Sequence, residues 1–346
     1  MNENPLLTIC VTTYNNEKTI EKTLRSILNQ SYPNFEIVVS DNGSSDKTIE
    51  IVNSFKSPKI SVRSNIKKIK SDKWYIGGYD NYNGCLESGM IKGEFVAFYH
   101  SDDIYEKDIA EKEVSFLVNN PGAGAVFSMG KMINEKDETT GKHKIPKELR
   151  DKDVYNFTDI FKNILKYGNT FLLTPTFMAR TNIFSKIGLF SEEKFETSAD
   201  LEMWLRILEN YDIGILKDNL INRRTNGLSV SYNSLRTREA DYFKAMDYFI
   251  KKESPNLNIE NKLLRQYAYQ KDTDNTLRAM NFLIKNEIES AQKTIQPLSI
   301  NTLQAFFENI NLLRIKILGL KIVILLCINM GLGKYLGKLL RLVLHF

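Results

Sequence analysis

Three clusters of polar side chains could do chemistry, because each comes directly after a short apolar run. They occupy residues 12–17, 41–46 and 100–103. Apolar runs of this length predict buried strands, and ligands of parallel sheets bind beyond the carboxyl ends of such strands. The three clusters are therefore expected to form one site, although Asn, Asp, Gly and Ser also favour ordinary turns.

Two adjacent carboxylates, Asp102 and Asp103, stand in the third cluster. Such a pair could hold a hard divalent cation that bridges the protein and the oxygens of a diphosphate. The alternative is structural, because an Asp at a helix N-terminus satisfies free backbone N–H groups. The sequence contains neither GxGxxG after its first apolar run nor GxxxxGK[ST], which disfavours a glycine-rich phosphate cradle.

The elements that must position these clusters alternate between strand and helix patterns. Short apolar runs predict strands at residues 7–13, 35–40, 60–62 and 95–99. Apolar residues at helical spacing follow the first two runs, and this alternation predicts an α/β fold with parallel strands and right-handed crossovers. Residues 134–153 are strongly charged and are expected to form an exposed loop. From about residue 237 the pattern is helical.

Composition excludes several classes of protein. Of the 346 residues, 42% are hydrophobic and 26% are charged, which predicts a globular protein with a sizeable core. Three scattered cysteines and only three histidines argue against a disulfide scaffold and a multi-histidine metal site. Residues 312–346 hold six basic residues and no acid, and the rest of the chain carries 41 basic and 42 acidic residues. No basic surface for a nucleic-acid polymer is therefore expected.

The basic segment at residues 312–346 is also rich in apolar side chains. Its longest charge-free stretch has twelve residues, 322–333, whereas a transmembrane helix needs roughly 20. Lys334, Lys338 and Arg341 follow helical spacing, with apolar residues opposite them. The segment is therefore predicted to be a basic amphipathic tail on an anionic membrane surface. The alternative is an ordinary core helix that docks on the catalytic domain.

Ordered motifs over about residues 6–231 resemble those of family 2 glycosyltransferases with the GT-A fold. The first two polar clusters are similar to the nucleotide loops of that family, and the third to its DxD motif. Its acceptor-side segment and its closing loop are matched by residues 187–190, 198–206 and 224–231. The resemblance implies a Rossmann-like mixed sheet with a helical C-terminal extension. The expected parts are a GT-A catalytic domain at 1–235, a helical extension at 236–311 and the tail at 312–346.

The resemblance also implies how a nucleotide-sugar is bound. Tyr14 or a neighbour would stack on the base, and Asp41 would accept the imide N–H of uracil. Thr13 and Glu17 would complete the pocket around the base and ribose. Arg224, in the closing loop, would meet the diphosphate oxygens, because a guanidinium matches phosphate geometry. Arg206 and Arg223 are further candidates for that role.

Asp102 is expected to face both the metal and the diphosphate. His100 stands where the family has the first acid of its DxD motif. An imidazole is a poor partner for Mg²⁺ but can accept Mn²⁺, so either Mn²⁺ or Mg²⁺ is expected as cofactor, with His100 and Asp102 as its ligands. Asn226 stands where the closing loop often carries a histidine.

Asp200 is the expected general base, with Glu196 as the fallback. Direct inversion needs a carboxylate that takes the acceptor's hydroxyl proton. The resemblance implies an inverting hexosyltransferase that moves a sugar from a UDP-sugar to a hydroxyl of a surface glycan. With the tail, it implies a lipid-linked acceptor and a cytoplasmic enzyme peripheral on the inner leaflet. Alternatives are a non-catalytic scaffold of a glycan assembly complex and, less favoured, a sugar-phosphate nucleotidyltransferase.

Overall fold

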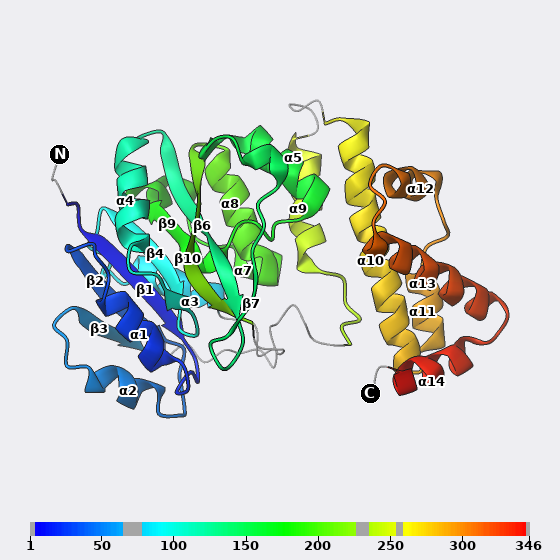
Figure 1. Ribbon diagram of the computed structural model, residues 1–346, viewed down its shortest axis with the longest axis horizontal. Helices are drawn as coiled ribbons and strands as arrows, with labels where there is room; N and C mark the ends of the chain where they lie inside the picture. Colours follow the sequence, from blue (N-terminus) through cyan, green and yellow to red (C-terminus); the bar gives the residue numbers. More distant parts are fainter. Residues whose placement is uncertain (1–3, 65–77, 226–234, 254–258, 344–346) are drawn as a thin grey trace. The chain divides into compact units, whose positions relative to one another are not determined.

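The computed structural model describes residues 4–64, 78–225, 235–253 and 259–343. The chain divides into two compact units, residues 1–227 and 228–346, and each is described by itself (Figure 1). All the predicted site residues belong to the first unit. In its described part the second unit is entirely helical, as the sequence pattern predicts.

A mixed sheet of ten strands forms the centre of the first unit. Its main order is β3-β2-β1-β4-β9-β6-β10-β5, with β7 paired to β6 and β8 to β10. β1 is parallel to β2 and β4, whereas β9 is antiparallel to β4 and β6. The strands are β1 Leu7–Thr13, β2 Phe35–Asp41, β3 Ile60–Ser64, β4 Phe95–His100, β5 Ile104–Tyr105, β6 Ala123–Ile133, β7 Thr139–Lys142, β8 Val154–Tyr155, β9 Phe177–Arg180 and β10 Asp212–Arg224. The predicted α/β class and its mixed sheet are confirmed.

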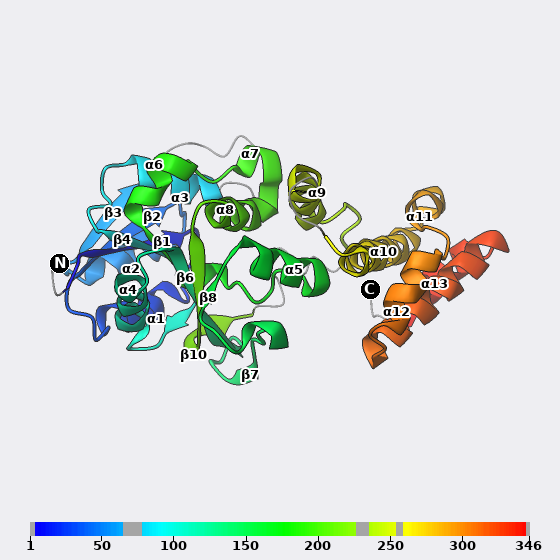
Figure 2. The same cartoon turned by 90° about the horizontal axis from the view of Figure 1, so that it is seen from above.

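Helices cover both faces of this sheet, with α1, α2 and α4 on one side and α3, α6 and α8 on the other (Figure 2). Alternation along β1 explains both layers, because successive side chains of a strand point to opposite faces. Ile9 and Val11 join the apolar cluster that includes Leu24 of α1, whereas Cys10 meets Cys85 of α3. The helices are α1 Ile20–Leu28, α2 Thr48–Ser54, α3 Gly78–Glu87, α4 Ile109–Asn119, α5 Phe157–Tyr167, α6 Phe184–Ile187, α7 Glu192–Phe195 and α8 Ala199–Leu208.

Residues 134–153 are not the continuous exposed loop that their charge predicts. They include β7, which pairs antiparallel with the end of β6. Asn134 builds the turn between the two strands, because its side-chain oxygen accepts the N–H groups of Lys136 (2.9 Å) and Glu138 (3.0 Å). Asp137 has a φ of 65°, a left-handed conformation that Asp adopts more readily than most residues. A charged hairpin thus replaces the predicted loop.

One carboxyl group in the core has no obvious structural role. Glu113 of α4 is fully buried, and neither of its oxygens has a hydrogen-bond partner among the described residues. Burial raises the pKa of Glu113 well above its ordinary value, and Ser128 of β6 opposes that shift. Burial also raises the pKa of Tyr99 on β4, and the charge of Glu113 adds to it. A neutral carboxylic acid is therefore the favoured form of Glu113 in the core.

The second unit is built around its longest helix, α10, against which α11, α12, α13 and α14 pack. An apolar cluster joins Leu283 of α10 to Ile324 of α13 and Leu336 of α14. Lys321 of α13 is 1% exposed and forms an ion pair with Asp272 of α10. The helices are α9 Asp241–Glu253, α10 Asn261–Ile284, α11 Ile288–Thr294, α12 Ile300–Phe307, α13 Leu312–Asn329 and α14 Gly333–Val343.

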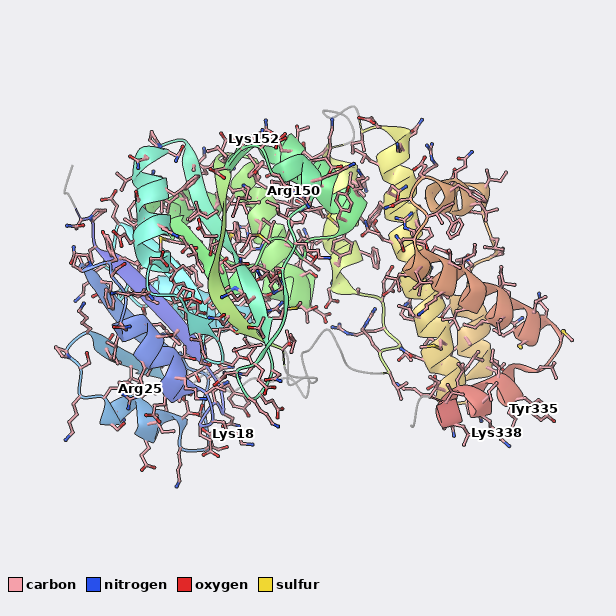
Figure 3. The ribbon with its side chains drawn as sticks, viewed as in Figure 1. Lys18, Arg25, Arg150, Lys152, Tyr335 and Lys338 are labelled. Atoms are coloured by element: carbon pink, nitrogen blue, oxygen red, sulfur yellow. The ribbon has the colours of Figure 1, made fainter. Side chains whose placement is uncertain are left out.

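The predicted tail therefore packs with one face on α10 of the helical unit, whereas the alternative to a free amphipathic segment placed it on the catalytic domain. Its other face stays exposed, and Figure 3 shows Tyr335 and Lys338 projecting outward from α14. Within the described ranges, no helix combines the length and the apolar character that a membrane span requires.

Candidate active site

The three polar clusters meet at one edge of the sheet. In the β1–β2 pair Thr13 lies opposite Asp41, and in the β1–β4 pair Thr12 lies opposite His100. The backbone N–H of Asn42 donates to the carbonyl of Thr13 at 2.9 Å, which joins the first two clusters. Parallel pairing thus brings the carboxyl ends of β1, β2 and β4 together, as the spacing of the clusters predicts.

The loops after β1 and β2 are joined by reciprocal hydrogen bonds. The N–H of Asn15 donates to Ser44 Oγ at 2.9 Å, and the Oδ1 of Asn15 accepts the N–H of Ser45 at 2.8 Å. The carboxylate of Glu17 accepts the N–H of Lys47 at 3.1 Å, just before α2 begins. The carboxylate of Glu17 therefore already helps to hold the second loop. Asn15 has a φ of 51°, a left-handed conformation that Asn adopts more readily than most residues.

Asp41 is buried at the centre of the second loop. Its two carboxylate oxygens accept the N–H of Gly43 at 3.1 Å, the N–H of Ser44 at 3.0 Å and the hydroxyl of Ser44 at 2.5 Å. Close beside it in the sheet, Thr13 Oγ1 is buried and lacks a hydrogen-bond partner in the described part of the chain. Tyr14, the next residue, is 52% exposed. The residues predicted for the base pocket therefore share one pair of loops, and their roles stay predictions.

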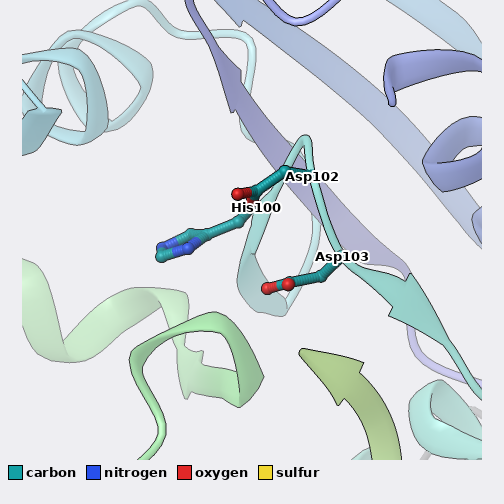
Figure 4. Close-up of side chains that lie close together, drawn as sticks. All are labelled: His100, Asp102 and Asp103. Carbon is teal, nitrogen blue, oxygen red and sulfur yellow. The ribbon is translucent and has the colours of Figure 1, made fainter. Parts of the chain in front are cut away.

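His100, Asp102 and Asp103 form a cluster at the turn between β4 and β5. One donor atom from each lies within 4.8 Å of the other two. Figure 4 shows the three side chains directed to the same side of the turn. The structure thus brings the two expected ligands, His100 and Asp102, together with Asp103. Asp103 is the second carboxylate of the adjacent pair that the sequence offered for a cation.

The electrostatics of this cluster fit a divalent cation. Burial lowers the pKa of His100 to about 4, Asp102 opposes the shift and Arg223 adds to it, so the imidazole is neutral at pH 7. Burial raises the pKa of Asp103, and the neighbouring Asp102 raises it further. One oxygen of Asp103 accepts the N–H of Arg224 at 2.7 Å, whereas the other is buried with no hydrogen bond from any described residue. An imidazole and two carboxylates, one of which has a buried free oxygen, suit Mn²⁺ better than Mg²⁺.

Thr19, the residue just before α1, and Thr23 within α1 hold the turn that carries these ligands. Thr23 is fully buried, and its hydroxyl can donate either to the carbonyl of Ser101 (3.0 Å) or to that of Asp103 (2.7 Å). The hydroxyl of Thr19 reaches the same Ser101 carbonyl at 3.1 Å. Nothing in the sequence pattern marks these two residues, because the contacts join segments about eighty residues apart.

Arg224, at the end of β10, directs its guanidinium into the protein. The side chain is 4% exposed, and its Nε donates to the carbonyl of Asp102 at 3.0 Å. Its other nitrogens donate to the carbonyl of Asn134 at 2.7 Å and to Asp137 at 2.5 Å. The guanidinium thus links the turn that carries the cluster to the β6–β7 hairpin. Its role on the diphosphate stays a prediction.

The other two arginines considered for the diphosphate differ sharply. Arg206 on α8 donates to Glu202 and to the carbonyl oxygens of Ile187 and Leu189, so its hydrogen bonds are structural. Arg223 lies near the cluster, because its charge lowers the pKa of both His100 and Asp103. The closing loop beyond residue 225, including Asn226, lies outside the described residues.

Asp200 lies in the first turn of α8. Its carboxylate accepts the hydroxyl of Thr174 at 2.7 Å and the N–H of Leu201 at 2.6 Å. Burial raises the pKa of Asp200, and hydrogen bonds from Thr174, Leu201 and Tyr79 lower it in part. A carboxylate with a raised pKa is a stronger base than an ordinary one, and hydrogen bonds hold it in one orientation.

Two tyrosines of α3 connect Asp200 to the rest of the site, and sequence reasoning missed both. The ring of Tyr82 lies 6.5 Å from that of His100, at an interplanar angle of 23°. The charge of Asp200 raises the pKa of both Tyr79 and Tyr82, although burial is the larger cause. The available signal was their spacing of three residues, which places both on one face of a helix.

Comparison with known proteins identifies the family. The family described as glycosyl transferase family 2 matches residues 8–188. The chain belongs to glycosyltransferase family 2. It is similar to the UDP-Glc:alpha-D-GlcNAc-diphosphoundecaprenol beta-1,3-glucosyltransferase WfgD of Escherichia coli. The two are 26% identical over 264 residues, which cover 76% of this chain and 90% of WfgD.

Solved structures of glycosyltransferases share the fold. TarS 1-349 of S. aureus in complex with UDP-GlcNAc aligns with a TM-score of 0.58 and 19% identity, over 84% of this chain and 83% of that chain. The mannosyltransferase PcManGT of Pyrobaculum calidifontis, in complex with GDP-Man and Mn²⁺, aligns with a TM-score of 0.52 and 16% identity, over 99% and 87%. The family 2 chain therefore has the GT-A fold and is a glycosyltransferase.

Proposed function

We propose that this glycosyltransferase transfers one sugar, with inversion, from a UDP-sugar to a hydroxyl of a lipid-linked glycan. The observation that carries the proposal is a pair of tyrosines between Asp200 and His100. Tyr79 hydrogen-bonds Asp200, and its ring meets the ring of Tyr82 edge-on at 5.9 Å. The ring of Tyr82 in turn stacks on His100. A base and a cluster suited to a diphosphate-bound cation thus lie at the two ends of this tyrosine pair. That arrangement fits attack on the anomeric carbon from the face opposite the leaving diphosphate.

Asp200 is the proton acceptor in this proposal. As the acceptor oxygen bonds to the anomeric carbon, the bond from that carbon to the diphosphate oxygen breaks and its electron pair leaves with UDP. The hydroxyl proton moves to the carboxylate of Asp200, which Thr174 and Leu201 keep oriented. The protonated Asp200 would then lose this proton to solvent before the next turnover.

His100, Asp102 and Asp103 would hold the cation, with the predicted pair His100 and Asp102 as its core. When bound, Mn²⁺ or Mg²⁺ would neutralise charge that develops on the departing diphosphate. The neutral imidazole of His100 supplies a lone pair, and the unpartnered oxygen of Asp103 supplies a buried oxygen donor. The Mn²⁺ present in the PcManGT complex is compatible with this choice.

The donor is assigned to UDP-sugars from the loops after β1 and β2. Tyr14 offers an exposed ring for stacking. Asp41 would accept the imide N–H beside the hydrogen bonds that it already accepts from Gly43 and Ser44. Thr13 offers an unpartnered hydroxyl. WfgD uses UDP-Glc and the TarS complex contains UDP-GlcNAc, and both support a UDP-sugar. The diphosphoundecaprenol acceptor of WfgD supports a lipid-linked acceptor, and with such an acceptor we propose a peripheral position on the inner leaflet.

The experiment is a transfer assay with a panel of UDP-, GDP- and dTDP-sugars and a diphospholipid-linked GlcNAc acceptor. Expected results are product only with UDP-sugars, slow donor hydrolysis without acceptor, and inverted anomeric configuration by NMR. A protein that binds nucleotide but neither hydrolyses nor transfers any donor would support the scaffold alternative. What favours that alternative is that His100 replaces the first acid of the DxD motif. Release of pyrophosphate from a nucleoside triphosphate and a sugar phosphate would support a nucleotidyltransferase.

A further inference from the structure

The two helices of the predicted tail divide their basic residues between two faces. On the inner face, Arg314 donates to Gln266 at 2.8 Å and Arg341 donates to the carbonyl of Ile284 at 2.8 Å. Lys321, paired with Asp272, is the third inward cation. Gly337 lies against the backbone of Leu283, where a larger residue would clash. These contacts hold the two helices on the unit, and the three inward cations already have partners within the protein.

The outer face of α13 is almost entirely apolar. Ile315, Ile322, Leu326 and Met330 are between 39% and 68% exposed, at spacings of seven, four and four residues. Such spacings form one stripe along a helix. Lys316, which follows Ile315 in the sequence, is exposed to one side of this stripe. The apolar side chains of the stripe are exposed and do not contribute to the core. Folding of the unit therefore does not explain why they are apolar.

The outer face of α14 continues this pattern with more charge. Tyr335, Leu339 and Leu342 are between 56% and 75% exposed, and Lys334 and Lys338 stand exposed beside them. Tyr335 and Lys338 project outward in Figure 3. An aromatic ring with a polar tip and lysines with long apolar stems suit the boundary between water and hydrocarbon.

We propose that these outer faces, here called the lipid-docking face, bind the surface of an anionic bilayer. Its cations are Lys316, Lys334 and Lys338, and residues 312–346 contain no acid to oppose them. A second copy of the chain is disfavoured as the occupant, because symmetric pairing would bring like charges together. A bilayer receives both features, since headgroups attract the lysines and the acyl boundary accepts the apolar stripe.

This inference deepens the proposed function, because it rests in part on the lipid-linked acceptor proposed there. It differs from the sequence-based prediction in assigning only three of the six basic residues to the membrane. The inward cations Arg314, Lys321 and Arg341 should affect folding, whereas the outward lysines should affect lipid binding alone. That division is what an experiment can separate.

The test is flotation of the full chain with vesicles of phosphatidylcholine, with and without phosphatidylglycerol. The variant Lys316→Gln/Lys334→Gln/Lys338→Gln removes the outward charges, and each is expected to contribute about fivefold in partitioning. Loss on the order of 100-fold is expected for anionic vesicles at low salt. The matched control is Lys244→Gln/Lys251→Gln/Lys262→Gln, which makes the same charge change at exposed lysines of α9 and α10 and should bind as wild type.

A second variant, Ile322→Ser/Leu326→Ser/Leu339→Ser, removes exposed apolar groups and should abolish the binding that survives high salt. Equal binding of wild type to neutral and anionic vesicles, or wild-type binding by the triple lysine variant, would overturn the proposal. The proposal would also be overturned if the wild-type protein did not float with vesicles but formed a dimer that Leu326→Ser dissociates. Donor hydrolysis in solution should be unchanged in every variant. Its absence from wild type that still floats would count against the proposed function and leave the lipid-docking face standing.

Discussion

Replacing Asp200 by Asn tests the proposed base directly. Asn has nearly the same shape and can still accept a hydrogen bond from Thr174, but it cannot take a proton at neutral pH. Loss of a general base costs about 10²–10⁴-fold in rate, or about 3–5 kcal/mol of transition-state stabilisation. The hydrogen bonds of Asp200 involve Thr174, Leu201 and Tyr79 rather than the nucleotide loops, so UDP affinity should be retained.

The pH profile supplies an independent readout of the same carboxylate. Burial raises the pKa of Asp200, so kcat/KM should fall as the pH drops through a value above its ordinary 3.8. Thr174→Val removes a hydrogen bond that lowers this pKa, so the acid limb should move to higher pH. The same variant is expected to keep a folded structure, because Val is close in size to Thr.

The assays are transfer from a UDP-sugar, UDP binding by calorimetry and thermal unfolding of each variant. Glu196→Gln is the matched control, because it makes the same chemical change at the fallback carboxyl and should retain activity. Near wild-type transfer by a folded Asp200→Asn protein that binds UDP normally would remove Asp200 from the mechanism. Loss of transfer by Glu196→Gln alone would place the base there instead.

Three further predictions concern the metal, the turn and the core. EDTA should abolish transfer, Mn²⁺ should restore it at least as well as Mg²⁺, and Asp102→Ala should weaken UDP binding only when metal is present; full activity in EDTA would make Asp102 a structural residue. Arg224→Gln removes the ion pair with Asp137 and should lower the free energy of unfolding by about 2–3 kcal/mol and raise the Mn²⁺ concentration for half-maximal activity; a raised donor KM at unchanged stability would instead favour the predicted diphosphate contact. Glu113→Gln should stabilise the protein by about 1–3 kcal/mol at pH 7 in urea unfolding. Because the pKa of Glu113 is raised on folding, wild type loses stability as the pH rises above 4.5, so this advantage should shrink toward pH 4.5, and a constant difference would refute a protonated Glu113.

Local patterns were enough to predict the sheet edge and most of the site. Strands such as β1 and β2 are short apolar runs, and the polar residues after them can lie only at the strand ends. Parallel pairing then follows from the intervening helices, so the meeting of residues 12–17, 41–46 and 100–103 could be inferred without a structure. Roles carried by family resemblance, such as that of Tyr14 on the base, remain predictions.

Contacts between distant segments could not be predicted in this way. Thr23 supports the carbonyls of Ser101 and Asp103 across about eighty residues, and no periodicity marks it. Tyr82 belongs to a helix whose neighbourhood in the sequence is polar and irregular, so its position beside His100 depends on tertiary packing. The hairpin of β6 and β7 was hidden by its charge, because side-chain hydrogen bonds from Asn134 rather than apolar residues build its turn.

The tail illustrates what composition can and cannot determine. Counting charges shows six cations without an acid in residues 312–346, and any helix drawn through them has some basic face. Only the packed structure distinguishes Arg341, which donates to a carbonyl of α10, from Lys338, which stays exposed one turn earlier. An inward cation contributes to the free energy of folding and an outward one to the free energy of binding. Equal substitutions at the two positions should therefore change different measurements, the first thermal unfolding and the second vesicle flotation.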